Sequence, residues 1–339
     1  ALPIYRVYVN GEKVIDYWGE HASAKRDYTL KATAGTDYKI RIEYMQAGAE
    51  ALLRFDLGIY RHISPEMVVD RVKEADIVIF AGGISPSLEG EEMYSVNSPG
   101  FAGGDRTSIE LPQVQRDILK ALKKAGKKVV FVNCSGSAVA LVPEMESCDA
   151  ILQAWYPGQS GGLAVADVLF GDFNPSGKLP VTFYKNTDQL PDFEDYSMKN
   201  RTYRYMTEVP LFPFGYGLSY TTFDISKGRL NKKTISAGQD LNFKVNVKNT
   251  GKYDGAEVIQ VYVRKVDDAE GPIKSLRAFR RVPLKAGETC VVSIDLLPTT
   301  FEFFDPTTNT MRIMPGKYEI MYGNSSDIPS GNKLSVTLR

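Results

Sequence analysis

The chain has 339 residues, of which 43% are hydrophobic and 24% are charged. These are ordinary values for a globular protein and exclude intrinsic disorder. Forty-one Lys and Arg residues balance forty-one Asp and Glu residues, so the zero net charge gives no general attraction to nucleic acid or to an anionic membrane. No apolar run approaches the roughly 20 residues that cross a bilayer. We expect two or three domains of roughly 150 residues each and a small or neutral ligand.

The cysteines predict neither a metal site nor a disulfide framework. Cys134, Cys148 and Cys290 lie far apart in the sequence, without the spacing of metal ligands, and an odd number cannot form a complete set of disulfides. Cys134 and Cys148 stand in apolar surroundings, where a free cysteine usually behaves as a small buried hydrophobic residue. The redox compartment stays open.

Residues 1–60 show the period-2 alternation of β-strands. Asn10-Gly11 tolerates the positive φ of a type I′ turn, so RVYV-NG-EKVI predicts a hairpin. Alternation in DYTLKA, DYKIRIEYM and ALLRFDLGI predicts the later strands of a β-sandwich. The aromatic residues of this segment are expected in its core rather than in a sugar-binding platform; they include Tyr5, Tyr8, Trp18, Tyr28, Tyr38 and Tyr44. Because a strand begins almost at once and no Met precedes it, we interpret the chain as a piece of a longer protein.

From Ser64 onward, helices and strands alternate. Ser64-Pro65-Glu66 combines an N-cap, a first-turn proline and an early acidic residue, which predicts a helix to about Lys73. Strands are expected at DIVIFAGG, KKVVFVNC and AILQAWYP, and helices at LPQVQRDILKALKKAG and GLAVADVLFGD. The apolar run DIVIFAGG is typical of a strand buried on both faces of a parallel sheet. The alternation predicts an α/β domain with a mostly parallel, doubly wound sheet.

Three loops follow these strands. The carboxyl ends of parallel strands lie along one edge of the sheet, and ligands bind beside that edge. The loops there are GGISPSLEGEEMYSVNSPGFAGGDR, NCSGS and YPGQSGG. We therefore expect the chemistry of the protein in these loops.

The rest of the chain predicts two further parts. Residues 172–223 are rich in Pro, Gly and aromatic residues with little periodicity, so we expect a long irregular strap. Residues 224–339 carry short strands separated by turn signals, which is the pattern of an antiparallel β-sandwich. Since this module shows no catalytic cluster, a structural role is favoured over ligand binding.

The first loop holds Glu89, Glu91 and Glu92 within four residues, followed by Asp105 and Arg106. Crowded carboxylates can supply a general acid, because like charge and partial burial raise the pKa of one of them. The alternative is a solvated acidic loop. By default Asp105 and Arg106 form a loop-stabilising charge pair or a helix-approach feature, and Arg106 can in addition face the crevice.

The third loop contains Gly158-Gln159-Ser160-Gly161-Gly162, which matches the G-x-S-x-G pattern of a nucleophile elbow. The base of such a hydrolase usually follows the serine, whereas His21 and His62, the histidines of this sequence, precede the sheet. Tight strand-to-helix packing explains the glycines better. Nucleotide binding is not supported either, because the phosphate-binding glycine patterns are absent.

The order and spacing of these elements resemble the carboxyl-terminal half of family 3 glycoside hydrolases over nearly the whole chain. The resemblance is carried by SLEGEE, GGDRTSIELPQVQRDIL, KKVVFVNCSGSAV, AILQAWYPGQSGGLAVADVLFGDFNPSGKLPVTF, RTYRY, PLFPFGYGLSYTTF and the VNVKNTG and GAEVIQVYV segments of a fibronectin-type module. It implies that residues 1–60 are the latter part of an inserted protective-antigen-type β domain. Residues 61–223 are then the α/β sandwich domain, and residues 224–339 a fibronectin type III-like β-sandwich. A (β/α)8 barrel precedes these parts in the family and is absent here.

The resemblance further implies a retaining, exo-acting β-glycosidase with its nucleophile aspartate on the barrel and its acid/base glutamate in the first loop. Aligning Glu89-Gly90-Glu91-Glu92 with the family patterns G-E-G and E-A-E-G places Glu91 at the acid/base position. Glu89 is the fallback and Glu92 the third choice. Glu89 and Arg106 are expected to bind substrate. Two departures are that Glu92 replaces the usual Gly and that MYSVNSPGFAGG separates the glutamates from Asp105-Arg106.

The loop resembles β-xylosidases of polysaccharide-degrading bacteria first and β-glucosidases second, which implies β-linked oligosaccharides such as those of xylan as substrate. Proton transfer among carboxylates, sugar and water needs no metal and no cofactor. A periplasmic or secreted location is implied, and a homo-oligomer stays open. The alternative from a different class is a non-catalytic carbohydrate-binding or scaffold protein, which binds xylo- or cello-oligosaccharides without cleaving them.

Overall fold

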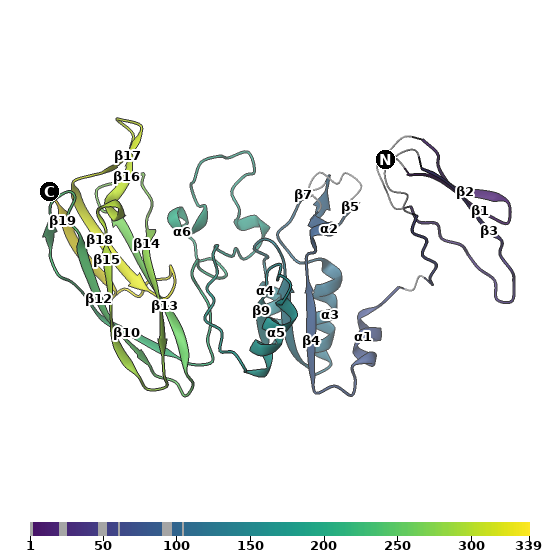
Figure 1. Cartoon of the computed structure of the whole chain (residues 1–339), viewed down its shortest axis with the longest axis horizontal. Helices are drawn as coiled ribbons and strands as arrows, with labels where there is room; N and C mark the ends of the chain where they lie inside the picture. The colour runs from purple at the N-terminus through teal and green to yellow at the C-terminus, as the bar shows by residue number, and fades with distance from the viewer. Residues whose placement is uncertain (1–2, 20–25, 47–52, 60–61, 90–96, 104) are drawn as a thin grey trace. The chain divides into compact units, whose positions relative to one another are not determined.

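The computed structural model describes residues 3–19, 26–46, 53–59, 62–89, 97–103 and 105–339 (Figure 1). The chain divides into two compact units, Ala1–His62 and Ile63–Arg339. Within the described residues, no helix has both the length and the apolar character needed to span a membrane.

The first unit contains a three-stranded antiparallel sheet. Its strands are β1 (Pro3–Val9), β2 (Glu12–Tyr17) and β3 (Ile40–Gln46), in the order β2-β1-β3. The predicted hairpin is confirmed, because Asn10 and Gly11 join β1 to β2 with φ angles of 50° and 90°. The strands predicted at 27–32 and at the described residues 53–59 are wrong, since neither segment is assigned to a sheet. Alternating side chains do not make a strand where the backbone has no hydrogen-bonded neighbour.

The aromatic residues of this unit do not form a closed core. Trp18 is 41% exposed and Tyr28 is 48% exposed, and among the described residues of the unit Ile4 is the one buried hydrophobic residue. The Trp18 ring is covered by a cation, the Arg6 guanidinium carbon lying 4.3 Å from the ring centroid. The expected burial is therefore wrong for Trp18 and Tyr28. In the described residues no second layer packs on this sheet, and a single layer leaves apolar groups in solvent.

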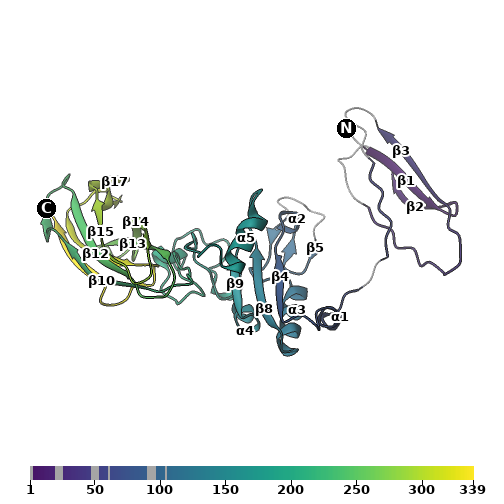
Figure 2. The ribbon, with the colours of Figure 1, turned by 60° about the horizontal axis from the view of Figure 1, so that its bottom comes forward.

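The second unit begins with an α/β domain. Its described parallel sheet has the order β4-β8-β9, formed by β4 (Ile77–Gly83), β8 (Lys128–Cys134) and β9 (Ala150–Gln153). The helices around it are α1 (Pro65–Arg71), α3 (Gln113–Lys124), α4 (Val142–Ser147) and α5 (Gly161–Phe170). Figure 2 shows α3 and α4 on one side of the strands and α5 on the other. The predicted α/β alternation and the parallel direction are confirmed.

Local chemistry explains where the helices begin and end. Ser64 is the N-cap of α1, and its side chain accepts a hydrogen bond from the Met67 amide at 3.4 Å. Gly126 follows α3 and Gly171 ends α5, with φ angles of 75° and 83° that glycine adopts without strain. The sequence predicts both the N-cap of α1 at Ser64 and the end of α3 at Gly126.

Burial of the sheet differs from the prediction at β4. Val78 and Phe80 pack in the domain core, whereas Ile77 and Ile79 on the opposite face are 56% and 52% exposed. The expectation that this strand is buried on both faces is therefore wrong. β4 is the edge strand of the described sheet, and no described element covers that face of it.

The cysteines are all free in the structure. Cys148 is buried in the core, as predicted, and burial raises the pKa of its thiol to about 12. Cys134, at the end of β8, is only half-buried, so its predicted full burial is wrong.

The strap, residues 172–223, is largely irregular, as predicted, with the short helices η1 (Thr187–Gln189) and α6 (Thr202–Tyr205).

A β-sandwich follows the strap. Its smaller sheet has the order β10-β12-β15, with β10 (Phe223–Leu230), β12 (Leu241–Asn249) and β15 (Thr289–Leu296). Its larger sheet consists, in spatial order, of β11 (Thr234–Ile235), β19 (Lys333–Leu338), β18 (Gly316–Gly323), β13 (Gly255–Lys265) and β14 (Ser275–Leu284).

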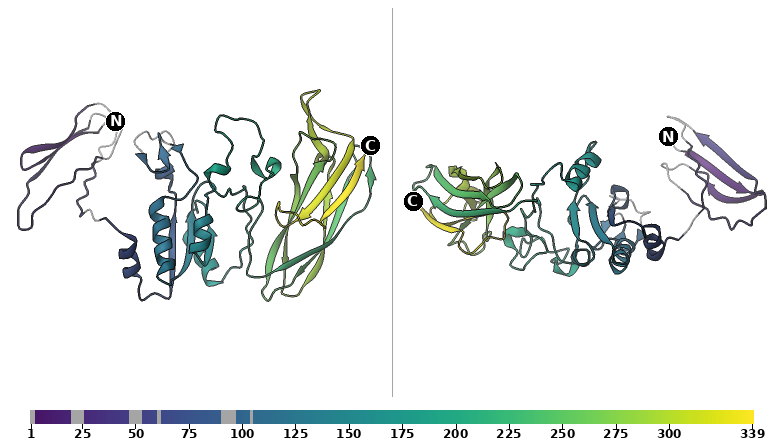
Figure 3. Two further views of the ribbon diagram at one scale, coloured as in Figure 1. Left: turned by 180° about the vertical axis from the view of Figure 1, so that it is seen from behind. Right: turned by 90° about the horizontal axis from the view of Figure 1, so that it is seen from below.

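The remaining elements of the sandwich are η2 (Pro298–Phe301), β16 (Glu302–Asp305) and β17 (Thr310–Ile313). All neighbouring strands of the two sheets run antiparallel except the short pair β11 and β19. Figure 3 shows the two sheets facing each other, with the strap between them and the α/β domain. The predicted antiparallel sandwich is confirmed.

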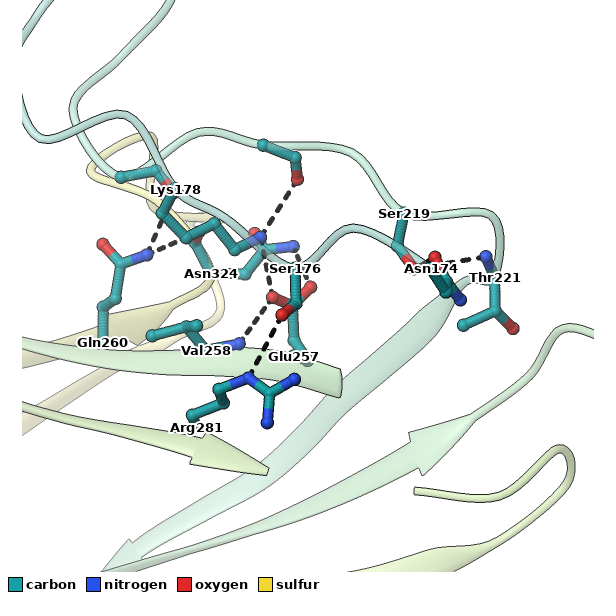
Figure 4. Close-up of polar contacts among 12 residues, drawn as sticks. Asn174, Ser176, Lys178, Ser219, Thr221, Glu257, Val258, Gln260, Arg281 and Asn324 are labelled. Carbon is teal, nitrogen blue, oxygen red and sulfur yellow. Dashed lines mark hydrogen bonds and ion pairs between the residues drawn. The ribbon is translucent and has the colours of Figure 1, made fainter. Parts of the chain in front are cut away.

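A buried ion pair fixes the strap to β13 of the sandwich (Figure 4). Lys178 Nζ lies 2.7 Å from Glu257 Oε1 and donates to the Gly217 carbonyl at 3.0 Å. The second carboxylate oxygen of Glu257 accepts from Asn324 Nδ2 at 2.9 Å. The side chains of Lys178 and Glu257 are only 12% and 6% exposed, so each charge depends on the other for compensation.

Gln260, three residues further along β13, makes a second contact to the strap. Its Nε2 donates to the Gly215 carbonyl at 3.0 Å and to the Asn324 carbonyl at 2.7 Å. An added Cβ at Gly215 would lie 2.0 Å from the Gln260 Oε1, and Gly215 has a φ of 78°. A side chain of the sandwich therefore bonds to the backbone of the strap.

Replacing Lys178 by Met is expected to lower the free energy of unfolding by about 3–5 kcal/mol, because it leaves the buried Glu257 carboxylate unpaired. Urea unfolding of the chain, followed by circular dichroism, measures this loss. The double variant Lys178→Met, Glu257→Gln is expected to recover much of it.

Lys123→Ala provides the control, because the Lys123–Asp149 pair, at 3.2 Å, is also in contact but is 45% exposed on both sides. Equal losses for Lys178→Met and Lys123→Ala would show that the buried pair does not hold the strap.

Candidate functional site

The candidate site lies at the carboxyl edge of the parallel sheet, where β4 ends at Gly83. The side-chain amide of Gln115, on α3, brackets this glycine. Its Oε1 accepts from the Gly83 N–H at 2.8 Å, and its Nε2 donates to the Gly83 carbonyl at 2.7 Å. Gly83 has a φ of 123°, and an added Cβ would lie 2.0 Å from the Cys134 carbonyl oxygen. Glycine therefore lets β4 stay paired with β8 to its last residue, and the first loop leaves the sheet from a fixed point.

The three predicted loops meet at this edge. Glu89 ends the short helix α2 (Pro86–Glu89) in the loop after β4. Ser137 Oγ, in the loop after β8, donates to Glu89 Oε1 at 3.0 Å. The Tyr156 hydroxyl, in the loop after β9, donates to Glu89 Oε2 at 2.6 Å. We call these three residues the Glu89 cluster; it takes one residue from each loop.

The hydroxyl of Tyr156 keeps its hydrogen at neutral pH. Burial, followed by the hydrogen bond and the negative charge of Glu89, raises the pKa of Tyr156 to about 12. Its hydroxyl also lies 2.9 Å from the Ile84 carbonyl oxygen. Gly136 permits this approach, since an added Cβ there would lie 2.5 Å from the Tyr156 ring and 3.1 Å from Glu89 Oε2. The phenol is thus a fixed hydrogen-bond donor.

A buried amide network lies beneath Ser137. Asn133 Nδ2, at the end of β8, donates to Gln153 Oε1, at the end of β9, at 2.6 Å. Gln153 Nε2 donates to Ser135 Oγ at 3.1 Å, and Ser135 Oγ donates to the Ser137 carbonyl at 2.9 Å. Asn133 and Ser135 are fully buried. The ends of two strands are therefore joined by side chains, and the second loop is held close to the sheet.

Arg106 contacts the Glu89 cluster through Ser137. It lies in a small antiparallel sheet made of β5 (Asn97–Ser98), β6 (Phe101–Ala102) and β7 (Asp105–Arg106). Its Nη1 donates to Ser137 Oγ at 2.9 Å, and its Nε donates to the Ser108 carbonyl at 3.1 Å. Its Nη2 lies 3.5 Å from the Glu110 carbonyl oxygen. Burial lowers the pKa of Arg106, while the Glu89 carboxylate opposes that shift. Each guanidinium nitrogen therefore contacts a group of this chain.

The predicted site residues are only partly within the described chain. The structure brings Glu89 and Arg106 together around Ser137. Glu91 and Glu92 lie in 90–96, outside the described residues, so the acid/base assignment stays a prediction. Among the described residues, no group of three His, Cys, Asp or Glu side chains is arranged to hold a metal ion.

The glycines of the third loop have different roles. An added Cβ at Gly161, the first residue of α5, would lie 2.2 Å from Pro157 Cβ, so the predicted close packing is confirmed there. Gly158 and Gly162 have no atom within 4 Å of an added Cβ, and for them the prediction is wrong. Ser160 is the N-cap of α5, but its side chain forms no capping hydrogen bond.

Sequence reasoning located the loops but did not single out Ser137, Tyr156 or Gln115. Tyr156 and Ser137 carry a usable signal, because each is a polar side chain within a few residues of the carboxyl end of a parallel strand. Gln115 carries none, since it lies on α3, and its contact with β4 depends on how that helix packs on the sheet.

Residues 6–220 match the C-terminal domain of glycosyl hydrolase family 3, and residues 257–326 match a fibronectin type III-like domain. A xylan 1,4-beta-xylosidase of Xylanibacter ruminicola is 53% identical over 337 residues, covering 98% of this chain and 38% of that protein. A periplasmic beta-glucosidase of Salmonella typhimurium is 38% identical over 280 residues, covering 78% of this chain and 35% of that protein. The chain thus spans little more than a third of the length of these relatives.

Solved structures show the same fold. A β-glucosidase from Erythrobacter marinus superimposes with a TM-score of 0.70 at 34% identity, covering 81% of this chain and 36% of that one. A β-glucosidase from Listeria innocua in complex with isofagomine gives a TM-score of 0.66 at 31% identity, covering 82% of this chain and 39% of that one.

Replacing Gly83 by Ala is expected to destabilise the α/β domain by more than about 2 kcal/mol, because it combines an unfavourable φ with a clash against β8. Thermal unfolding of the chain measures the effect. Gly158→Ala is the matched control in the third loop and is expected to leave the melting temperature unchanged, since its Cβ meets no atom. A melting temperature for Gly83→Ala equal to that of Gly158→Ala would show that the edge of the sheet is not fixed in this way.

Proposed function

Since the chain belongs to glycosyl hydrolase family 3, we propose that it is part of a retaining, exo-acting β-glycosidase and supplies the acid/base glutamate from the loop after β4. The observation that carries the proposal is the meeting of three strand-end loops around a glutamate at the carboxyl edge of the sheet. A (β/α)8 barrel outside this chain would carry the nucleophile, which the family resemblance makes an aspartate.

Glu91 is the proposed acid/base residue. It donates a proton to the glycosidic oxygen as the barrel aspartate attacks the anomeric carbon and the leaving group departs. It then takes a proton from the water that hydrolyses the glycosyl-enzyme. Glu89 is the fallback for this role and Glu92 the third choice. Glu89 and Arg106 are also proposed to lie beside the substrate, where their hydrogen bonds to Ser137 support them.

The proposed substrate is a terminal β-linked sugar of a plant polysaccharide oligomer. β-Xylosidase activity is favoured by the 53% identity to a protein named xylan 1,4-beta-xylosidase, and β-glucosidase activity comes next. The partners are then the oligosaccharide and the barrel domain, with no nucleic acid, and the chemistry requires no cofactor. A periplasmic or secreted location is supported by the resemblance and by the name of the Salmonella relative. Assays of 4-nitrophenyl β-xyloside against β-glucoside decide the sugar.

Glu91→Gln, in the protein that joins this chain to its barrel, is expected to lower turnover of a β-linked disaccharide by about 10²–10⁴-fold, the usual contribution of a general acid. Turnover of 4-nitrophenyl glycosides is expected to fall less at the first step, because their leaving group needs no proton. Azide is expected to restore the turnover of these 4-nitrophenyl glycosides, because azide attacks the glycosyl-enzyme without the help of a general base. Steady-state kinetics with and without azide make the measurement.

Glu92→Gln tests the third choice for the acid/base residue and is expected to keep most of the activity, because Glu91 is intact in this variant. Unchanged turnover of the disaccharide by Glu91→Gln would refute the assignment. Binding of xylo- or cello-oligosaccharides by the isolated 339-residue chain, measured by calorimetry, would instead support the carbohydrate-binding alternative.

A further inference from the structure

Both carboxylate oxygens of Glu89 are held by side chains of other loops. Ser137 donates to one oxygen at 3.0 Å and Tyr156 donates to the other at 2.6 Å. Because the two donors approach different oxygens, they fix the rotation of the carboxylate as well as its position. A side chain held on both oxygens is restrained more tightly than one with a single contact.

The two donors are themselves fixed. Arg106 Nη1 donates to Ser137 Oγ at 2.9 Å. A hydroxyl has one hydrogen, so the contact from Arg106 occupies a lone pair and leaves the hydrogen of Ser137 directed at Glu89. The fully buried Ser135 holds the Ser137 carbonyl at 2.9 Å. On the other side, Tyr156 is confined by the close approach of Gly136. Both donors are thus held by groups of this chain.

We propose that Glu89 is a positioning residue for the acid/base loop, with Ser137 and Tyr156 holding its carboxylate and thereby anchoring the chain two residues before Glu91. This inference rests on the proposed function of Glu91. Two residues span at most about 7 Å, so an anchor at Glu89 restricts where the backbone of the acid/base residue lies. Misplacing a catalytic group by about 1 Å costs on the order of 10²-fold in rate.

The test uses Ser137→Ala and Tyr156→Phe in the protein that joins this chain to its barrel. Each variant removes one donor to Glu89 and no group assigned to the sugar. Each is expected to lower kcat for a β-linked disaccharide by about 10–10²-fold, with KM within about twofold. The loss with a 4-nitrophenyl glycoside at the glycosylation step is expected to be smaller, because that leaving group needs little protonation.

Tyr220→Phe is the matched control. This variant removes a phenol hydroxyl as well, but Tyr220 donates to the Val168 carbonyl and makes no contact with the Glu89 cluster. It is expected to keep wild-type kinetics. Ser137→Thr keeps the hydroxyl at an exposed position and is expected to restore kcat. Melting temperatures of all variants separate a local effect on the loop from a loss of fold.

The possible results are distinct. A preferential loss of disaccharide kcat in Ser137→Ala and Tyr156→Phe, reversed in Ser137→Thr, supports the positioning role. Kinetics like those of Tyr220→Phe would overturn it, even if Glu91→Gln cripples the enzyme and so upholds the proposed function. A rise in KM with kcat unchanged would overturn it, because the Glu89 cluster would then act on substrate binding alone. Azide rescue of Glu89→Gln, with Glu91→Gln active, would overturn both proposals by making Glu89 the acid/base residue.

Discussion

The pairing of β4 with β8 up to Gly83 and Cys134 is the constraint on which the candidate site depends. Parallel strands send their following loops out along one edge, and here the pairing continues to the last residue of both strands. An added Cβ at Gly83 would lie within 2.0 Å of the β8 backbone, so the pairing requires a residue without a side chain. Gln115 then satisfies both backbone groups of Gly83 from the helix side. The Glu89 cluster forms because the three loops start from such fixed points.

The strap supports the same site from the side of the sandwich. Glu110, whose carbonyl contacts Arg106, accepts hydrogen bonds from the Thr187 amide at 2.9 Å and from its hydroxyl at 2.5 Å. Thr187 belongs to the strap, and the strap is fixed to β13 by the Lys178–Glu257 ion pair and by Gln260. The strap therefore contacts the sandwich at one point and, through Thr187 and Glu110, the guanidinium beside Ser137 at another. These contacts give a fibronectin type III-like module, which has no catalytic cluster among its described residues, a structural reason to accompany the α/β domain.

How much of this was predictable depends on the range of the interaction. The N-cap at Ser64, the hairpin at Asn10-Gly11 and the convergence of the three loops follow from local chemistry and from the geometry of parallel sheets, and all are confirmed. The Lys178–Glu257 pair joins residues far apart in the sequence, and no periodicity connects them. The prediction that Ile79 on β4 is buried is wrong. An apolar run shows that both faces of a strand are suited to burial, but burial itself depends on which elements pack on those faces.

The choice of donors to Glu89 is physically consistent with a nearby general acid. A general acid works best with a raised pKa, which a cation in direct contact with the carboxyl group opposes. Arg106 is not paired directly with Glu89 but acts through the hydroxyl of Ser137, and the second donor, Tyr156, is a neutral phenol. Two neutral donors fix the carboxylate in place without adding a positive charge in direct contact with it.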